Sequence, residues 1–321
     1  MVFQAPVLSF EKRTLRSIHV LCPPANTGCV GLNFADFVDV IDSGWNASVD
    51  RRDFVRSLVS AVAIAALPGR AADPIAVGIL DADPRSSFAA GVALGLTEAA
   101  RSESLFNRRV IFQRTGTDAD KLIALGVTAL VGRAPAVEVE RIATACNAKH
   151  VVYLDCGTRS DEFRRRCDSF VFHIEASESM YANAAKVADG ARVALWHPSL
   201  ERYGAAQLND RFRSAANGTM DGEAWCGWFA IKVLVESALR MNENSGAALR
   251  EHLLQGKTEF DGHKGAPLSF RAWDHQLRQP LYAVSPGKPA RDIPDLSRGE
   301  GSMRDQLDSI GDSSSACRAG S

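Results

Sequence analysis

Polar side chains follow the apolar runs in the first half of this sequence, at the points where buried strands would end. The segments concerned are 81–83, 114–117, 132–134 and 155–157. Each precedes a stretch of helical character, and the N–H groups of a helix N-terminus, together with hydroxyl side chains, suit a carboxylate or another anion. The same residue types also serve in turns and helix N-caps. The sequence therefore leaves both roles open at each segment.

Short motifs of the common enzyme classes are missing from the sequence. No Gly-x-Gly-x-x-Gly or phosphate-binding loop follows the first apolar run, which disfavours nucleotide binding. No Gly-x-Ser-x-Gly elbow or recognisable nucleophile–base spacing is present. No Cys-x-x-Cys or His-x-x-x-His pair offers metal ligands. We therefore predict that the chain is not an enzyme and binds no cofactor or metal.

Five of the seven cysteines lie beyond residue 72, at Cys146, Cys156, Cys167, Cys226 and Cys317. They can pair if this part of the chain is exported. Cys156 and Cys167 flank a short polar loop, so we predict a disulfide between these two. The odd count leaves at least one thiol free or paired between chains.

The elements that would position the polar segments alternate along residues 74–176. Strands are predicted at 74–83, 109–117, 127–134, 151–157 and 170–176, with helices at 86–104, 118–126 and 135–150. Nearly continuous apolar strands separated by helices indicate a parallel sheet covered on both faces. The carboxyl ends of such strands meet at one edge of the sheet, where open α/β proteins bind ligands.

The second half of the sequence is mostly helical. We predict a strand within 188–199, helices at 200–215, 224–241 and 246–256, and two strands at 266–271 and 279–284 that form a β-hairpin. Trp225 and Trp228 begin an apolar stripe along the helix at 224–241. We interpret this stripe as core rather than as a cofactor site.

Composition restricts the class of protein further. The chain is 46% hydrophobic and 23% charged, with a formal charge of −1. These values predict a folded core and give no electrostatic reason to expect a nucleic-acid partner. No run of 18 or more apolar residues is present, so we predict no membrane span in the mature protein.

Residues 49–72 contain the parts of an export signal. Arg51 and Arg52 precede an apolar run at 58–67, and small residues follow at 69–72. An arginine pair followed by Phe54 is typical of the twin-arginine export route, which predicts a periplasmic protein. A buried amphipathic helix is the alternative. Residues 1–48 are a leader of doubtful translation, because a start at Val49 and a true extension are both compatible with the sequence.

Two longer strings carry a resemblance to a known family. The segments AWCGWFAIKVLVESAL (224–239) and FDGHKGAPLSFRAWDHQLRQPLYAV (260–284) resemble the leucine/isoleucine/valine-binding family of type I periplasmic binding proteins. With the signal and the strand–helix array, the resemblance covers residues 74–285. Shorter strings at 164–167, 172–173, 208–212 and 307–311 resemble a branch associated with PQQ-dependent alcohol dehydrogenase systems.

The resemblance implies an α/β protein of two lobes that close around a small ligand. Lobe 1 would comprise residues 73–175. Only a short, mostly helical segment at 176–285 remains for lobe 2 and the closing hairpin, so we predict a reduced second lobe. Residues 286–321 are rich in Gly, Ser and charge and are predicted to be a flexible tail.

The resemblance also implies ligand-binding residues. Those expected from lobe 1, which would hold a carboxylate, are Ser86, Ser87, Thr115, Thr117 and Arg133. Trp196 and His197 would face the ligand from lobe 2. His197 equally suits a surface turn beside Pro198.

Two functions are compatible with these predictions. The first is the solute-binding component of an ABC importer, which captures a small polar molecule related to an amino acid, a short acid or an alcohol and delivers it to a permease. The second is a degenerate binding protein without a transport ligand, which acts as a partner of a periplasmic PQQ-dependent alcohol dehydrogenase.

Overall fold

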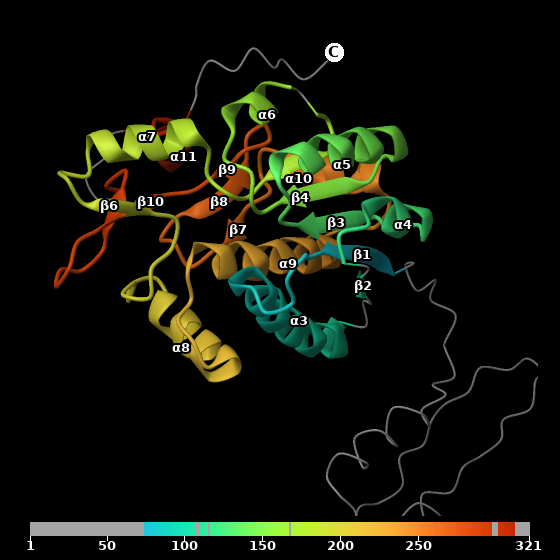
Figure 1. Ribbon diagram of the computed structural model, residues 1–321, viewed down its shortest axis with the longest axis horizontal. Coiled ribbons are helices and arrows are strands. Elements are labelled where there is room, and N and C mark those ends of the chain that lie inside the picture. Colours follow the sequence, from blue (N-terminus) through green and yellow to red (C-terminus); the bar gives the residue numbers. More distant parts are fainter. Residues whose placement is uncertain (1–73, 107–109, 115, 167, 297–300, 312–321) are drawn as a thin grey trace, which may run out of the picture. The chain divides into compact units, whose positions relative to one another are not determined.

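The computed structural model describes residues 74–106, 110–114, 116–166, 168–296 and 301–311 (Figure 1). The leader at 1–48 and the signal-like segment, with Arg51, Arg52 and Phe54, lie outside the described residues. Thr115 and Cys167 lie outside them too.

Five parallel strands form the main sheet, in the order β2-β1-β3-β4-β5. They are β1 (Ile75–Leu80), β2 (Val110–Arg114), β3 (Ala129–Gly132), β4 (Val152–Asp155) and β5 (Val171–His173). Successive side chains of a strand point to opposite faces. Val77 and Val131 accordingly join one apolar cluster and Leu80 and Leu130 the other. Because both faces are covered, the strands are continuous apolar runs in the sequence. The parallel pairing of the five strands confirms the predicted sheet.

Helices cover both faces of this sheet (Figure 1). One face carries α4 (Ala119–Ala124) and α5 (Ala136–Lys149); the other carries α3 (Ser87–Phe106), α9 (Gly222–Arg240) and α10 (Gly246–Leu254). The backbones of α3 and α9 touch. A Cβ added at Gly91 would lie 1.9 Å from the carbonyl oxygen of Ala224, and one added at Gly227 would lie 2.5 Å from that of Phe88. The helices α9 and α10 therefore pack with the first lobe, although the prediction assigned 176–285 to the second.

The second lobe is reduced to a small antiparallel sheet. Its strands are β6 (Arg192–Ala194), β10 (Leu281–Val284) and β11 (Arg291–Ile293), in the order β11-β10-β6. The helix α7 (Glu178–Lys186) packs on β6 and β10. The next helix, α8 (Ala205–Ala216), contacts α3 instead.

A C-terminal hairpin is present, but its second strand differs from the prediction. The strand β8 (Pro267–Phe270) pairs with β7 (Phe260–Asp261) and with β9 (Leu277–Arg278). The predicted partner at 281–284 is β10, which pairs with β6 and β11. Pro280 has no N–H to continue the ladder, so the chain can leave one sheet at this point and enter the other.

The predicted flexible tail is wrong for residues 286–296 and 301–311. The strand β11 extends the second-lobe sheet. The helix α11 (Met303–Asp308) begins with a capping box between Ser302 and Asp305. It buries Leu307, and Asp308 pairs with Arg278 at 2.9 Å.

The predicted disulfide between Cys156 and Cys167 is wrong, because Cys156 is a free thiol. Its sulfur is fully buried and lies 3.7 Å from the carbonyl oxygens of Leu154 and Cys226. The side chain thus faces the core beneath α9, away from solvent and from the polar loop. Cys146 and Cys226 are also free and buried.

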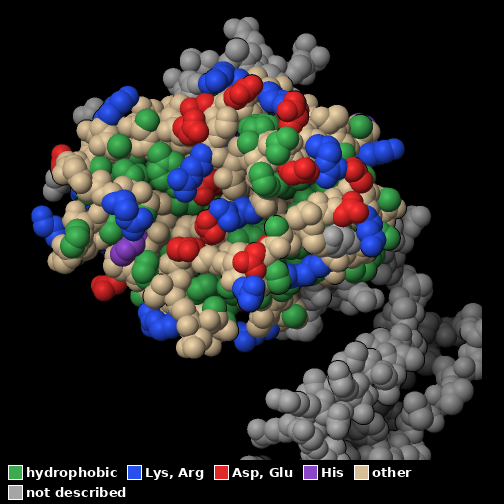
Figure 2. All heavy atoms as spheres, in the orientation of Figure 1, with side chains coloured by type: hydrophobic (Ala, Val, Ile, Leu, Met, Phe, Trp, Pro, Cys, Tyr) green, Lys and Arg blue, Asp and Glu red, His purple; other side chains and the backbone are tan. Residues whose placement is uncertain are grey.

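Among the described residues, no helix has the length and apolar character needed to cross a membrane. On the face shown in Figure 2, Lys and Arg side chains are interspersed with Asp and Glu. That face carries no extended basic patch, in keeping with the formal charge of −1.

Candidate ligand-binding pocket

A cavity of about 410 Å³ lies beside the carboxyl ends of β4 and β5, where the chain crosses to the second lobe. Small-molecule sites typically measure about 300–1,000 Å³. Its lining comes from the loop after β4, the segment after β5, the helix α7, the strand β6 and the N-terminus of α9. The lining residues are Arg159, Glu175, Tyr181, 192–198 and 219–223.

Glu175 is the most buried carboxylate of the cavity, at 3% exposure. Its Oε1 accepts hydrogen bonds from the Tyr181 hydroxyl at 2.8 Å and from the N–H of Ala176 at 3.1 Å. The Nε of Arg159 lies 3.5 Å from the same oxygen. Within the described residues Oε2 accepts no hydrogen bond. One carboxylate oxygen of a fixed side chain is therefore available to a ligand.

Burial raises the pKa of Glu175, and the opposite charge of Arg159 and the hydrogen bond from Tyr181 oppose this shift. The Arg159 guanidinium stacks over the Tyr181 ring at 4.5 Å. These three side chains form one unit, because each of them contacts the other two.

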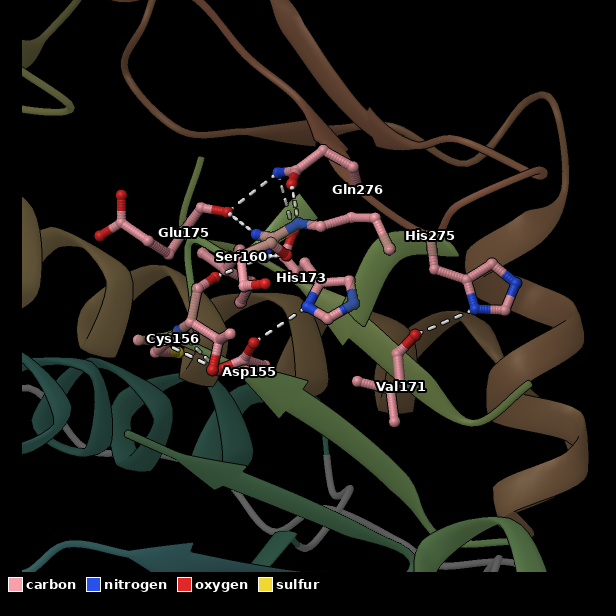
Figure 3. Close-up of polar contacts among 12 residues, drawn as sticks. Asp155, Cys156, Ser160, Val171, His173, Glu175, His275 and Gln276 are labelled. Carbon is pink, nitrogen blue, oxygen red and sulfur yellow. Dashed lines mark hydrogen bonds and ion pairs between the residues drawn. The ribbon is translucent and has the colours of Figure 1, made fainter. Parts of the chain in front are cut away.

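The backbone at Glu175 is held by a buried polar network (Figure 3). The Nη2 of Arg164, from α6 (Asp161–Arg165), donates to the Glu175 carbonyl at 2.8 Å, and the Nε2 of Gln276 donates to it at 3.0 Å. The Nε of Arg164 also donates to the Oε1 of Gln276 at 3.0 Å. Figure 3 shows the Glu175 carboxylate pointing away from this network, which leaves the network to position it.

Asp155 and His173 join the ends of β4 and β5 within the same network. Their Oδ2 and Nδ1 atoms are 2.9 Å apart, and both side chains are buried. Burial lowers the pKa of His173, and the nearby Arg164 lowers it further. Burial would raise the pKa of Asp155, but the hydrogen bond with His173 and the charge of Arg164 hold it below its ordinary value. Neutral His173 therefore donates its Nδ1 hydrogen to ionised Asp155 and fixes the two strand ends together.

Trp196 and His197 both line the cavity. Trp196 is buried, and its Nε1 donates to the Oδ1 of Asn209 at 2.9 Å. The Nδ1 of His197 lies 2.7 Å from the Ser199 hydroxyl. His197 thus takes part in a local turn as well as in the cavity wall, and ligand contact by either residue stays a prediction.

The first-lobe residues predicted to hold a carboxylate are not gathered at the cavity. None of Ser86, Ser87, Thr117 and Arg133 is among its lining residues. Ser86 accepts a hydrogen bond from the N–H of Ala89 at 3.0 Å, which is a helix-capping role, and Thr117 is exposed. Their ligand contacts stay a prediction, now without geometric support.

Two of these predicted residues bond to carboxylates of the chain itself. The Ser87 hydroxyl donates to Asp221 at 2.8 Å, and Arg133 pairs with Glu223 at 2.5 Å. Both acidic residues lie at the start of α9 and line the cavity. The N-terminus of α9 is therefore inserted between the cavity and the predicted carboxylate-binding groups.

Sequence reasoning missed Arg159, Glu175 and Tyr181. Glu175 carries the same signal as the polar segments after the first four strands, because it lies two residues beyond the end of β5. Arg159 and Tyr181 carried no comparable signal, because their positions depend on the α7 packing.

No family model matches this sequence, and no curated protein matches it. Solved structures do resemble it. One is a leucine-, isoleucine-, valine-, threonine- and alanine-binding protein from Brucella ovis, with a TM-score of 0.56, 10% identity and coverage of 69% of this chain and 92% of that one. Another is an ABC transporter substrate-binding protein from Desulfitobacterium hafniense, with a TM-score of 0.56, 12% identity and coverage of 68% and 100%.

A third similar structure is a solute-binding protein of an ABC transporter from R. palustris in complex with benzoate. Its TM-score is 0.54 at 12% identity, and the alignment covers 69% of this chain and 96% of that one. The chain therefore has the type I periplasmic-binding-protein fold, with a parallel sheet flanked by helices and a reduced second lobe.

Proposed function

We propose that this protein is the solute-binding component of an ABC importer and captures a small polar molecule in the pocket around Glu175. The observation that carries the proposal is the free carboxylate oxygen of Glu175 in a cavity at the carboxyl ends of β4 and β5. This edge of an open α/β sheet is where ligands bind. The similar structures include an amino-acid-binding protein and a solute-binding protein in complex with benzoate, which supports a binding role rather than catalysis.

Both lobes contribute to the pocket, as capture by closure requires. Arg159 and Glu175 follow strands of the first lobe, whereas Tyr181 and residues 192–198 come from the second. A ligand between them adds contacts that the open form lacks and so favours the closed form. The reduced second lobe restricts its share of these contacts to α7 and the segment around β6.

A thermal-shift screen of the full chain tests this function. The panel comprises amino acids, amides, short acids and alcohols. At a concentration of 100 times Kd, a ligand of the folded protein adds about 2.7 kcal/mol of stability. We expect at least one member to raise the melting temperature of the wild type and to have at least tenfold weaker affinity for Glu175→Gln. A flat screen would overturn the proposal.

Export through the twin-arginine route is the second part of the proposal. It rests on the order of Arg51, Arg52 and Phe54 before the apolar run. We expect the exported protein to begin near residue 72, as read by N-terminal sequencing. The double variant Arg51→Lys, Arg52→Lys should remain in the cytoplasm.

The alternative function, a partner of a PQQ-dependent alcohol dehydrogenase, has one observation in its favour. Ser87 and Arg133 are engaged by Asp221 and Glu223 rather than left for a ligand. Co-purification with the dehydrogenase together with a flat thermal-shift screen would favour this role. Ligand binding without co-purification would exclude it.

A further inference from the structure

Asp221 occupies a position that a ligand's anionic group could otherwise take. It is the N-cap of α9, and its Oδ1 accepts the N–H of Ala224 at 2.9 Å. Its Oδ2 accepts the hydroxyl hydrogen of Ser87 at 2.8 Å. A carboxylate at a helix N-terminus is favoured by the unpaired N–H groups and by the helix dipole. The Asp221 side chain thus occupies two groups that could bind the carboxylate of a ligand, the N-terminus of α9 and the hydroxyl of Ser87.

Glu223 likewise occupies Arg133, another group that could bind the carboxylate of a ligand. The Arg133 Nη2 lies 2.5 Å from its Oε1, and both side chains are 39% exposed. The Arg133 side chain also packs against the backbone of Gly157, since a Cβ added at Gly157 would lie 2.7 Å from the Arg133 Cγ. The guanidinium is therefore held on Glu223, and a ligand carboxylate would have to displace this partner.

The remaining charged groups of the cavity wall decide what can bind there. Glu175 presents an oxygen without a partner, and Asp221 and Glu223 place two more carboxylates on the wall. Arg159 lies against Glu175 and stacks on Tyr181. Among the described lining residues, the cation without an ion pair is Arg192, which is exposed at the start of β6. Within the described lining, carboxylate acceptors therefore outnumber cations, and the cation without an ion pair lies at the rim.

We propose that Asp221 and Glu223 act as specificity-determining residues, which exclude ligands bearing a carboxylate and leave Glu175 to select a solute that donates hydrogen bonds, such as an amide or an amine. This inference rests on the proposed solute-binding function. It distinguishes the pocket from the carboxylate-holding arrangement expected from the sequence, because two first-lobe groups of that arrangement, Ser87 and Arg133, are already bonded to carboxylates of the chain.

Matched pairs of probes test this selectivity in the full chain. Acetamide and acetate differ in the donor group but hardly in shape, as do benzamide and benzoate; methylammonium adds a cation without a carboxylate. Binding is measured by isothermal titration to the wild type, to the double variant Asp221→Asn, Glu223→Gln and to Glu175→Gln. Asparagine is a good N-cap, so the double variant retains the start of α9. Asp210→Asn, which removes an exposed carboxylate paired with Arg213 on α8, controls for charge alone.

We expect the wild type and Asp210→Asn to bind a donor probe at least tenfold more tightly than its carboxylate match. The double variant should lose this preference, and Glu175→Gln should lose affinity for the donor probe. Tighter binding of acetate or benzoate by the wild type would overturn the inference and leave the solute-binding function standing. An unchanged preference in the double variant would also overturn the role of Asp221 and Glu223. Absence of binding by every probe would count against both the inference and the function.

Discussion

At the scale of single residues, the site is built around a carboxylate that is costly to bury. Glu175 gives one oxygen to Tyr181 and Ala176 and leaves the other without a partner in the described part of the chain. An ionised side chain in such a place lowers stability unless its interactions compensate fully. A buried carboxylate of this kind at the carboxyl edge of the sheet is consistent with a binding role.

The raised pKa of Glu175 predicts how its replacement affects stability. The folded protein binds this proton more tightly than the unfolded chain, so the stabilising contribution is present below the unfolded value of 4.5 and is lost as pH rises through the folded pKa. Glu175→Gln keeps an acceptor for Tyr181 and removes the buried charge. We expect an unfolding free energy at pH 7 that equals the wild type or exceeds it by up to about 1 kcal/mol. Urea titration measures this, and a large loss of stability at pH 7 would contradict the account.

Lys264 is a second buried titratable group, which is not itself among the cavity lining but contacts Leu195 of that lining. Its Nζ donates to the carbonyl of Leu195 at 2.8 Å and to the Oε1 of Gln279 at 2.8 Å, and it lies 4.0 Å from the Trp225 ring centroid. Burial lowers its pKa from 10.5 to about 7. Its contribution to stability is therefore present above pH 10.5 and is lost as pH falls through about 7.

The wild type should consequently gain stability between pH 7 and pH 9, and Lys264→Met should gain less. The variant also leaves carbonyl acceptors without a donor, which costs about 1–3 kcal/mol at pH 9. Urea denaturation of both proteins at the two pH values checks this. An equal pH dependence in the two proteins would show that Lys264 does not titrate in this range.

At the scale of elements, patterning predicted strands and helices but not all of their partners. The five parallel strands follow from continuous apolar runs between helices. The partner of residues 281–284 did not follow, because apolar alternation does not specify which sheet a strand joins. The close contact of α9 with α3 depends on Gly91 and Gly227, whose role is clear only when both backbones are seen together.

The C-terminal helix α11 was not predictable from amino-acid composition. Residues 286–321 were predicted to be flexible from their Gly, Ser and charge content. Within them, Leu307 and Ile310 are 2% and 5% exposed. A short apolar pair suffices to dock α11 when Arg278 also pairs with Asp308, and composition averages over such a pair.

Substitutions in α11 test whether this docking stabilises the protein. Leu307→Ala should lower the unfolding free energy by about 2–4 kcal/mol through lost burial and the cavity left behind. Met303→Ala, on the same helix but 37% exposed, should change it by about 0.5 kcal/mol or less. Thermal unfolding of both variants provides the comparison. Equal, small effects of the two substitutions would show that the docking of α11 does not stabilise the protein and would favour the predicted flexible tail.

At the scale of the whole molecule, the described core is held by packing and hydrogen bonds rather than by the predicted disulfide. Burial raises the pKa of the Cys156 and Cys226 thiols well above the ordinary value and that of Cys146 to about 12. Buried thiols of this kind are unreactive. We expect a thiol reagent to modify none of these three in the native protein and all three after denaturation, as mapped by mass spectrometry. A peptide linking Cys156 to Cys167 would contradict the structure.

The location of the candidate site could be predicted from the sequence, but most of the residues that form it could not. Its place at the carboxyl edge of the sheet follows from the strand pattern alone. Its residues depend on α9, whose N-terminal carboxylates bind Ser87 and Arg133, and on α7, which brings Tyr181 to Glu175. The helix α9 reaches the edge through its contact with α3, and α7 packs on β10, so both depend on elements distant in sequence that no local pattern records.

The central claim is that the pocket around Glu175 binds one small solute. Native mass spectrometry of the full chain, incubated with a small-molecule extract of the producing cells, tests it most directly. We expect a single adduct of one small molecule per chain on the wild type, and a much weaker adduct on Glu175→Gln. No adduct on the wild type, or an adduct of equal intensity on both proteins, would contradict it.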